Sequence, residues 1–202
     1  MGPTGKRRGR PATFDRDAAL DAAVELFWRH GYEGASVAML TEAMGVAPPT
    51  LYAAFGSKPA LYREAMARYA GRGPRDQAAP PGSAYETVRR FLHAAAEQFT
   101  RPDRPKGCMV ATGSLRCGLD AKEAVDTAAL LRSKAFARFV GELEKAKGEG
   151  ELAEAADPIA LARFYMAVLQ GMSVQAIDGG DAEALHAIAD AALTAWPARE
   201  TT

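Results

Sequence analysis

The 202-residue sequence predicts an all-α protein with a small N-terminal helical unit and a larger C-terminal helical body. Apolar residues recur at spacings of three and four along most of the chain, as they do on one face of a helix. Alanine dominates the hydrophobic 48% of the chain, and β-branched residues are few. No stretch alternates with period two, so we expect closely packed helices and no sheet.

The first expected helix begins after Asp15, whose side chain can cap it, and runs to about Arg29. His30 and Gly31 supply a C-terminal stop. The apolar face of this helix is formed by positions i, i+3, i+4 and i+7, namely Leu20, Ala23, Val24 and Phe27.

The segment from Val37 to Lys58 reads VAMLTEAMGVAPPTLYAAFGSK and predicts two short helices about a Gly45-Val46 corner. Ser36 caps the first of them. The second runs from Pro48 to Phe55, and its larger apolar residues turn inward, so that small side chains face outward. This arrangement is typical of a helix-turn-helix that reads double-stranded DNA. A further helix follows, capped by Ser57 and running from Lys58 to about Ala70.

The stretch 71–82 is rich in glycine and proline and is interpreted as a linker, which divides the chain into residues 1–71 and 72–202. In the second part we expect five helical segments. They cover approximately residues 83–100, 108–117, 122–147, 158–177 and 181–196.

Basic residues near the N-terminus are the strongest charge feature of a chain whose net charge is zero. Residues 1–70 hold nine Lys and Arg against seven Asp and Glu, and five of these nine cations lie in residues 6–16. The arm Lys6–Arg10 can supply non-specific affinity for DNA phosphates, or it can be a solvated tail or a tag remnant. No apolar run has the length of a membrane span or follows the arm, so we expect a cytoplasmic protein without a membrane partner.

The sequence offers little for catalysis or metal binding. On one straight helix Cys108 and Cys117 would lie about 13.5 Å apart, too far for a disulfide, and we interpret them as small hydrophobic residues. His93 and His186 lie on helices without a neighbouring Cys, Asp or Glu at ligand spacing, and His30 fits a helix end. No nucleophile elbow, phosphate loop or carboxylate pair is found, so we expect no enzymatic activity, no catalytic residue, no metal and no cofactor.

These signals stand in the order that is typical of one family. A Gly-Val corner, then Thr-Leu-Tyr-x-x-Phe, then Ser-Lys-x-x-Leu form a specific combination, and residues 14–62 resemble the tetracycline-repressor (TetR) family of bacterial transcription regulators. The resemblance implies an all-α fold with an N-terminal three-helix DNA-binding unit, followed by a larger helical ligand-binding and dimerisation body. The matching residues are Phe14, Ala19, Leu20, Ala23, Leu26, Phe27, His30, Gly31, Tyr32, Ser36, Val37, Leu40, Ala43, Gly45, Val46, Thr50, Leu51, Tyr52, Phe55, Ser57, Lys58 and Leu61.

The residues and the resemblance together predict a DNA-reading surface. Thr50 can reach a base edge or a thymine methyl, whereas Ala53 and Ala54 can make only apolar contacts. The matching tyrosine of the family implies a phosphate contact for Tyr52, and Lys58 at a helix start can hold another phosphate. The predicted DNA-binding set is Arg8, Arg10, Ser36, Pro48, Pro49, Thr50, Tyr52, Ala53, Ala54 and Lys58.

The chain departs from the common family pattern at the start of the recognition helix. Ala47 stands where a serine often caps that helix, and Pro48 and Pro49 remove two backbone donors. We therefore expect fewer polar base contacts and more readout of DNA shape, with Arg10-Pro11 as a candidate for an adjacent minor groove.

The last two helices are predicted to hold a homodimer, which implies a double-stranded DNA operator with two-fold pseudo-symmetry. Alanine-rich stripes would permit a close four-helix interface. The alternative is that these stripes only complete the core of the subunit. The predicted interface is Phe164, Val168, Met172, Leu185, Ile188, Ala189, Ala192, Leu193 and Trp196.

The resemblance also implies a small-molecule effector in a mostly apolar pocket, whose methionines and aromatics give an adaptable wall. Few cations face this site, which favours a neutral or weakly polar molecule over a phosphate-bearing one. Thr112, Tyr165 and Gln170 are the polar groups that could orient it, although helical spacing also explains the candidate residues as core. The predicted pocket is lined by Phe91, Phe99, Met109, Thr112, Phe136, Phe139, Tyr165, Met166 and Gln170.

The sequence therefore predicts a ligand-responsive, sequence-specific DNA-binding regulator, most simply a repressor released from its operator by a small apolar molecule. One alternative keeps DNA binding but senses oxidants or electrophiles through Cys108 or Cys117, which a low thiol pKa would favour. Another alternative is a helical binding or enzyme domain without DNA binding. That alternative leaves the basic arm and the exposed recognition helix unexplained.

Overall fold

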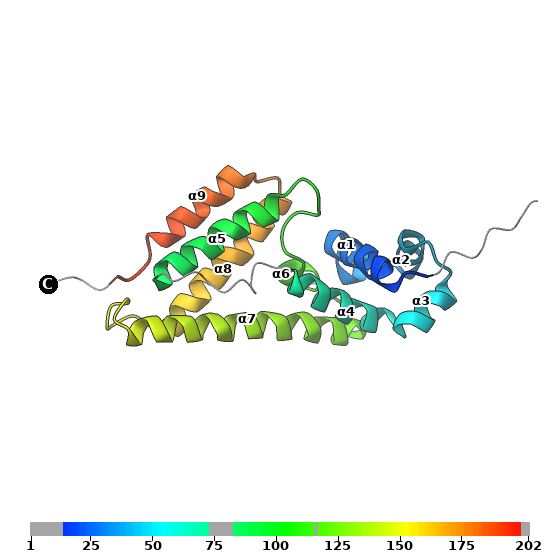
Figure 1. Ribbon diagram of the computed structural model, residues 1–202, viewed down its shortest axis with the longest axis horizontal. Helices are drawn as coiled ribbons and strands as arrows, with labels where there is room; N and C mark the ends of the chain where they lie inside the picture. The colour runs from blue at the N-terminus through cyan, green and yellow to red at the C-terminus, as the bar shows by residue number, and fades with distance from the viewer. Residues whose placement is uncertain (1–13, 73–82, 116, 199–202) are drawn as a thin grey trace, which may run out of the picture.

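The structure, a computed structural model, describes residues 14–72, 83–115 and 117–198. Figure 1 shows an elongated all-α molecule with a small helical head at one end, a larger body at the other, and α7 (Lys122–Gly148) running beneath both. We call α1–α4 the head and α5–α9 the body. In these residues there is no strand, only an isolated antiparallel bridge between Leu152 and Ala198. None of the described helices is long and apolar enough to cross a membrane.

The first helix, α1 (Arg16–Gly34), begins as predicted, because the Asp15 carboxylate accepts hydrogen bonds from two free amides of its first turn. Its helical path breaks at Gly31, where φ is 69°. A Cβ at this position would lie 3.2 Å from the Gly113 carbonyl oxygen. The predicted stop is therefore confirmed as a break that needs glycine for both its backbone angle and its close contact.

The helix-turn-helix has the predicted caps. Ser36 Oγ accepts from a backbone amide at 3.2 Å at the start of α2 (Val37–Met44), and Gly45 ends α2 in the left-handed conformation. The recognition helix, α3 (Pro48–Phe55), starts with its two prolines in the first turn, where missing amides cost least. Ala47 makes no side-chain cap hydrogen bond, because its methyl group has no polar atom.

The remaining helices follow the predicted segments closely. α4 (Lys58–Gly71) is capped by Ser57 and packs along α1. The predicted segment 108–117 contains only the single-turn α6, and the last helix ends before Trp196. The body helices are α5 (Ala84–Thr100), α6 (Met109–Thr112), α7, α8 (Pro158–Ile177) and α9 (Ala182–Leu193), with a 3₁₀ turn at Leu119–Ala121.

The head and the body meet at α6 and α7. The Tyr32 amide, directly after the break in α1, donates to the Gly113 carbonyl at 2.9 Å. α4 packs on α7, and Arg63 pairs with Glu123 there at 2.7 Å. The orientation of α4 is therefore set by contacts with both parts of the molecule.

The apolar stripe of α9 packs inside the subunit, against the antiparallel helix α5 (Figure 1). Because α5 covers this face, the stripe is explained by the core of the subunit and is not left open for a second copy. The residues of the predicted dimer interface that are buried in this way are Met172, Leu185, Ala189, Ala192 and Leu193. Of the others, Phe164 is 40% exposed, while Val168, Ile188 and Trp196 are partly buried.

Candidate nucleic-acid interface

The outer face of α3 is small and mostly apolar. Leu51 and Phe55, 0% and 4% exposed, anchor the helix to the head, whereas Tyr52 is 46% exposed. A helix with so few bulky side chains can enter a major groove about 12 Å wide. Of the other predicted reading residues, Pro48, Pro49 and Ala53 are exposed, and Thr50 and Ala54 are partly buried.

Ser36 lies at the N-terminus of α2 and is exposed. Its Oγ accepts the Met39 amide, so its hydroxyl proton remains free to donate. The Val37 and Ala38 amides precede the first intrahelical hydrogen bond, and the helix dipole favours an anion at this end. The geometry suits a DNA phosphate oxygen.

Lys58 is engaged inside the head. Its Nζ lies 4.4 Å from the centre of the Tyr32 ring in a cation–π contact. Burial lowers the pKa of Lys58, against smaller opposing effects of Glu33 and Cys117. This placement differs from the predicted phosphate contact, because a phosphate would have to draw the ammonium off the ring.

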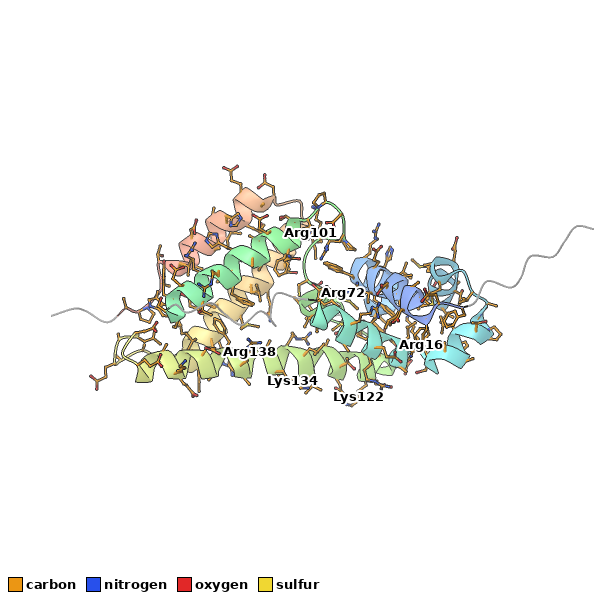
Figure 2. The ribbon with its side chains drawn as sticks, viewed as in Figure 1. Arg16, Arg72, Arg101, Lys122, Lys134 and Arg138 are labelled. Carbon is orange, nitrogen blue, oxygen red and sulfur yellow. The ribbon has the colours of Figure 1, made fainter. Side chains whose placement is uncertain are left out.

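Arg16, one of the five cations counted in residues 6–16, is engaged within the head. Arg8 and Arg10 lie outside the described residues, and Arg16 belongs to α1 (Figure 2). Arg16 Nη2 pairs with Glu64 Oε2 at 2.7 Å, and its guanidinium lies 4.6 Å from the Phe55 ring centre. Arg16 therefore holds the start of α1 against α3 and α4.

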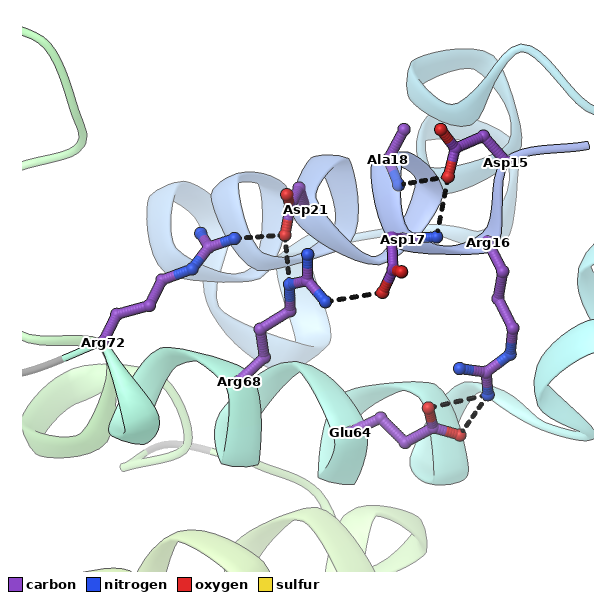
Figure 3. A network of polar contacts seen from close by, with 8 residues as sticks. All are labelled: Asp15, Arg16, Asp17, Ala18, Asp21, Glu64, Arg68 and Arg72. Carbon is purple, nitrogen blue, oxygen red and sulfur yellow. Dashed lines mark hydrogen bonds and ion pairs between the residues drawn. The ribbon is translucent and has the colours of Figure 1, made fainter.

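Ion pairs tie α1 to α4 along their contact (Figure 3). Arg68 bonds to Asp17 at 2.8 Å and also to Asp21, and Arg72 bonds to Asp21 as well. The hydrogen bond from Arg68 lowers the pKa of Asp21, so this carboxylate is ionised at neutral pH, and its stabilising contribution is lost only under acid conditions. We call the following set the α1–α4 ladder: Arg16, Asp17, Asp21, Glu64, Arg68 and Arg72.

A cavity of about 450 Å³ lies between the head and the body. This volume is within the range of small-molecule sites. Its charged lining residues balance, because two are acids, Glu25 and Asp103, and two are bases, Arg72 and Arg104. The indole N–H of Trp28, another lining residue, is buried without an acceptor in the described part of the chain. The remaining lining residues are Val24, Tyr69, Ala70, Phe91, Ala95, Gln98, Phe99, Cys108 and Leu169.

The predicted pocket inside the body coincides with this cavity only at Phe91 and Phe99. Tyr165 is fully buried, and burial raises its pKa to about 12. Gln170 is exposed on α8, and the Thr112 hydroxyl donates to a carbonyl one turn back in its own helix. The other predicted lining residues, Met109, Phe136, Phe139 and Met166, belong to the core or pack against it.

The contribution of the head to the cavity was not predicted from the sequence. Trp28 and Tyr69 meet edge to face with ring centres 4.8 Å apart and form the wall from α1 and α4. Val24 and Trp28 are one turn apart, at the edge of the apolar face of α1. A large aromatic residue at that edge is the one signal that could have indicated a second apolar contact.

The two cysteines are free and differ in their surroundings. Burial raises the pKa of the Cys117 thiol, Glu33 raises it further, and Lys58 opposes them. Cys117 therefore lacks the low pKa that favours thiol sensing. Cys108 is 7% exposed and lines the cavity.

Comparisons with known proteins agree with this geometry. The family model described as "Bacterial regulatory proteins, tetR family" matches residues 19–65. The HTH-type transcriptional repressor ComR of Escherichia coli (strain K12) is 36% identical over 196 residues, which cover 95% of this chain and 93% of ComR. The repressor BdcR of the same strain is 37% identical over 112 residues, 52% of this chain and 55% of BdcR.

A solved structure of the TetR family transcriptional regulator CifR is also similar. It is a cysteine mutant complexed with 26-base-pair operator DNA, with a TM-score of 0.85 and 42% identity, covering 94% of this chain and 100% of that one. ComR is related over nearly its whole length, and the family model covers α2, α3 and most of α1 and α4. The chain therefore belongs to the tetR family of bacterial regulatory proteins and is a DNA-binding, helix-turn-helix transcriptional regulator.

Proposed function

We propose that this protein is a repressor that leaves its operator when a small, neutral and largely apolar molecule occupies the cavity between head and body. The observation that carries the proposal is the position of the cavity, whose walls include α1 and α4 of the head as well as α5 of the body. An occupant can release DNA only by binding one arrangement of head and body better than the other. A cavity shared by both parts changes shape when head and body move relative to one another, which supports such a preference.

DNA docking is assigned to two helix faces of the head. α3 enters the major groove, with Thr50, Ala53 and Ala54 toward the bases, while the Tyr52 hydroxyl and the Ser36 end of α2 contact phosphates. The exposed face of α3 carries no charged side chain, so phosphate contacts and DNA shape supply a large share of the affinity. Lys134 and Arg138 lie on the part of α7 remote from α3 and are not assigned to DNA (Figure 2).

A homodimer is proposed through the outer faces of α8 and α9. α9 exposes Ala184, Ala187 and Ala191, spaced by three and four residues. On α8 the stripe of exposed small or apolar residues is Ala160, Phe164, Ala167, Gly171 and Val174. Two copies of these faces form a four-helix contact in which small residues allow close approach. Of the residues that the sequence predicts for the interface, Phe164 is the one that is exposed in the structure.

The effector class follows from the lining of the cavity. Aromatic walls from Trp28, Tyr69, Phe91 and Phe99 suit an aromatic or aliphatic body. The Trp28 N–H is buried without an acceptor in the described part of the chain, so a ligand acceptor that reached it on a movement of the ring would be favoured. Because the charged lining residues balance, a net charge on the ligand is not required.

A second candidate is electrophile sensing at Cys108. The observation in its favour is that Cys108 lines the same cavity, so a reactive molecule bound there would meet its thiol. Cys117 does not share this position, and its pKa is raised.

Replacing Tyr52 with Phe should weaken binding to all duplexes alike, by about tenfold, because a hydrogen bond to a charged phosphate contributes roughly 1.5–3 kcal/mol and carries no base information. Fluorescence anisotropy on duplexes selected from random DNA and on unrelated duplexes measures this. Thr50→Ala should instead change sequence preference. Tyr85→Phe, in the body, is the matched control; equal losses in the two tyrosine variants would refute the docking.

Ala187→Glu on α9 and Ala167→Glu on α8 should each convert a dimer to a monomer at micromolar concentration, because each buries unpaired charge in the interface. Light scattering measures the mass, and circular dichroism confirms that helicity is kept. Ala137→Glu, on the exposed side of α7, is the matched control and should remain dimeric. A monomeric parent protein, or dimeric variants at both sites, would show that these faces do not dimerise.

The neutral aromatic dye Nile red should bind the parent protein with increased fluorescence, and Ala95→Trp should reduce its affinity at least tenfold by filling the cavity. Ala137→Trp adds the same side chain to the surface of α7 and should bind dye normally. Equal dye binding by all three proteins would contradict the cavity as the ligand site.

For the electrophile alternative, intact-mass analysis after iodoacetamide treatment should show an adduct that Cys108→Ser removes.

A further inference from the structure

Four titratable side chains form a continuous hydrogen-bonded chain between α5 and α9. His93 Nε2 lies 2.8 Å from Asp190 Oδ1, and His186 Nε2 lies 2.7 Å from Glu97 Oε1. The two imidazoles meet at their other nitrogens, with 2.9 Å between His186 Nδ1 and His93 Nδ1. We call these four residues the histidine chain. It is separate from the DNA-reading face and from the cavity lining.

The pattern is present in the sequence, although it was not predicted. Glu97 follows His93 by four residues on α5, and Asp190 follows His186 by four residues on α9. The expectation that neither histidine has a neighbouring acid at ligand spacing was therefore wrong. Since α5 and α9 run antiparallel, each histidine reaches the acid of the opposite helix. The three hydrogen bonds of this chain cross between two helices, so they cannot be read from either helix alone.

Counting protons shows which protonation state the histidine chain requires. A carboxylate only accepts hydrogen bonds, so each Nε2 must carry a proton to donate to its acid. Two neutral imidazoles in that state would point two Nδ1 lone pairs at each other across 2.9 Å. One proton between them turns this repulsion into an N–H···N hydrogen bond of ordinary length.

We propose that the histidine chain holds one proton more than two neutral imidazoles and acts as a proton-dependent clamp of α9 on α5. With no extra proton, two lone pairs oppose each other. With two extra protons, two N–H groups oppose each other. Only the singly protonated pair makes all three hydrogen bonds, so the clamp has an optimum in pH and weakens on both sides of it.

The distance between the two Nδ1 atoms favours a shared proton over a bridging metal ion. Two imidazole nitrogens on a tetrahedral zinc ion at about 2.0–2.1 Å would lie about 3.3 Å apart, and opposite one another about 4 Å apart. The observed 2.9 Å is shorter than either. Among the described residues, no group of three or more His, Cys, Asp or Glu side chains is arranged to hold a metal ion.

Other charges near the pair are few. On α5, Arg89 and Arg90 lie one turn before His93, and Arg89 is paired with Glu86. On α9, Glu183 lies one turn before His186. α8 packs against both helices, and its single charged side chain, Arg163, lies over the Phe136 ring of α7. Glu97 and Asp190 are therefore the charged groups that bond directly to the two histidines.

The position of the clamp gives it a regulatory consequence, which rests on the proposed function. α5 presents Phe91 and Ala95 to the cavity, and His93 and Glu97 lie on the opposite side of the same helix. α9 carries the alanines proposed for the dimer. The clamp thus joins a wall of the ligand site to a dimer helix. Its existence is testable without DNA, ligand or dimerisation.

Nitrogen-15 NMR of histidine-labelled protein counts the protons directly. The full chain carries three histidines, so His30→Gln leaves only the proposed pair in the spectrum. In a pH series recorded after exhaustive EDTA treatment, we expect an optimum at which both Nε2 atoms are protonated and one proton is shared between the Nδ1 atoms. Two independent neutral rings, or a spectrum that changes on removal and return of Zn²⁺, would overturn the proposal.

A double-mutant cycle measures the coupling in the folded protein. His93→Gln, His186→Gln and the double variant should show a coupling of about tenfold in the unfolding equilibrium constant at the optimum pH, because the shared bond involves a charged group. This coupling should fall on both sides of that optimum. His30→Gln should leave it unchanged, and all proteins are compared at one concentration. A coupling that is absent, or that changes in one direction only, would refute the clamp.

Discussion

The α1–α4 ladder is the set of ion pairs that holds the first and last helices of the head against one another. α3 has eight residues and is held from inside by Leu51 and Phe55, so its direction is set by the helices that flank it. The ladder fixes α1 on α4, from Arg16 beside Phe55 to Arg72 beside the cavity. Exposed ion pairs stabilise a fold little when taken singly. Placed in series along two helices, they define one relative position, which is what a recognition helix requires.

Contacts with the body hold the head in place. α4 rests on α7, and the Tyr32–Gly113 hydrogen bond holds the end of α1 to α6. Elsewhere the cavity separates the head from α5. The proposed ligand would therefore bind beside the contacts that hold α1 and α4 to the body. The recognition helix itself is small and weakly polar. In the proposed dimer, an effector would act by changing the position of this helix relative to that of the second subunit.

Much of the fold was predictable because its signals are local. Caps at Asp15, Ser36 and Ser57, together with Gly31 and Gly45, placed the helices of the head to within a few residues. The partners of exposed charged residues were not predictable, since Arg16 looks like part of a basic arm until Glu64 is placed beside it. The cavity and the histidine chain also depend on which helices cross. Helical spacing identifies an apolar face but does not say whether a neighbour in the same subunit, a second copy or a ligand covers it.

The ratio of operator affinity to non-specific affinity in Asp21→Asn tests the role of the ladder most directly. Net charge alone leaves this ratio unchanged, because it acts on all DNA alike, whereas the ladder predicts that the ratio falls. Removing a negative charge from the head should strengthen DNA binding if only net charge matters. If Asp21 fixes α1 on α4, its loss should weaken operator binding relative to unrelated DNA, and Arg68→Gln should do the same. We expect the ratio of operator to non-specific affinity to fall about tenfold in both variants, a loss near 1.4 kcal/mol. An unchanged or higher ratio for Asp21→Asn would contradict the account.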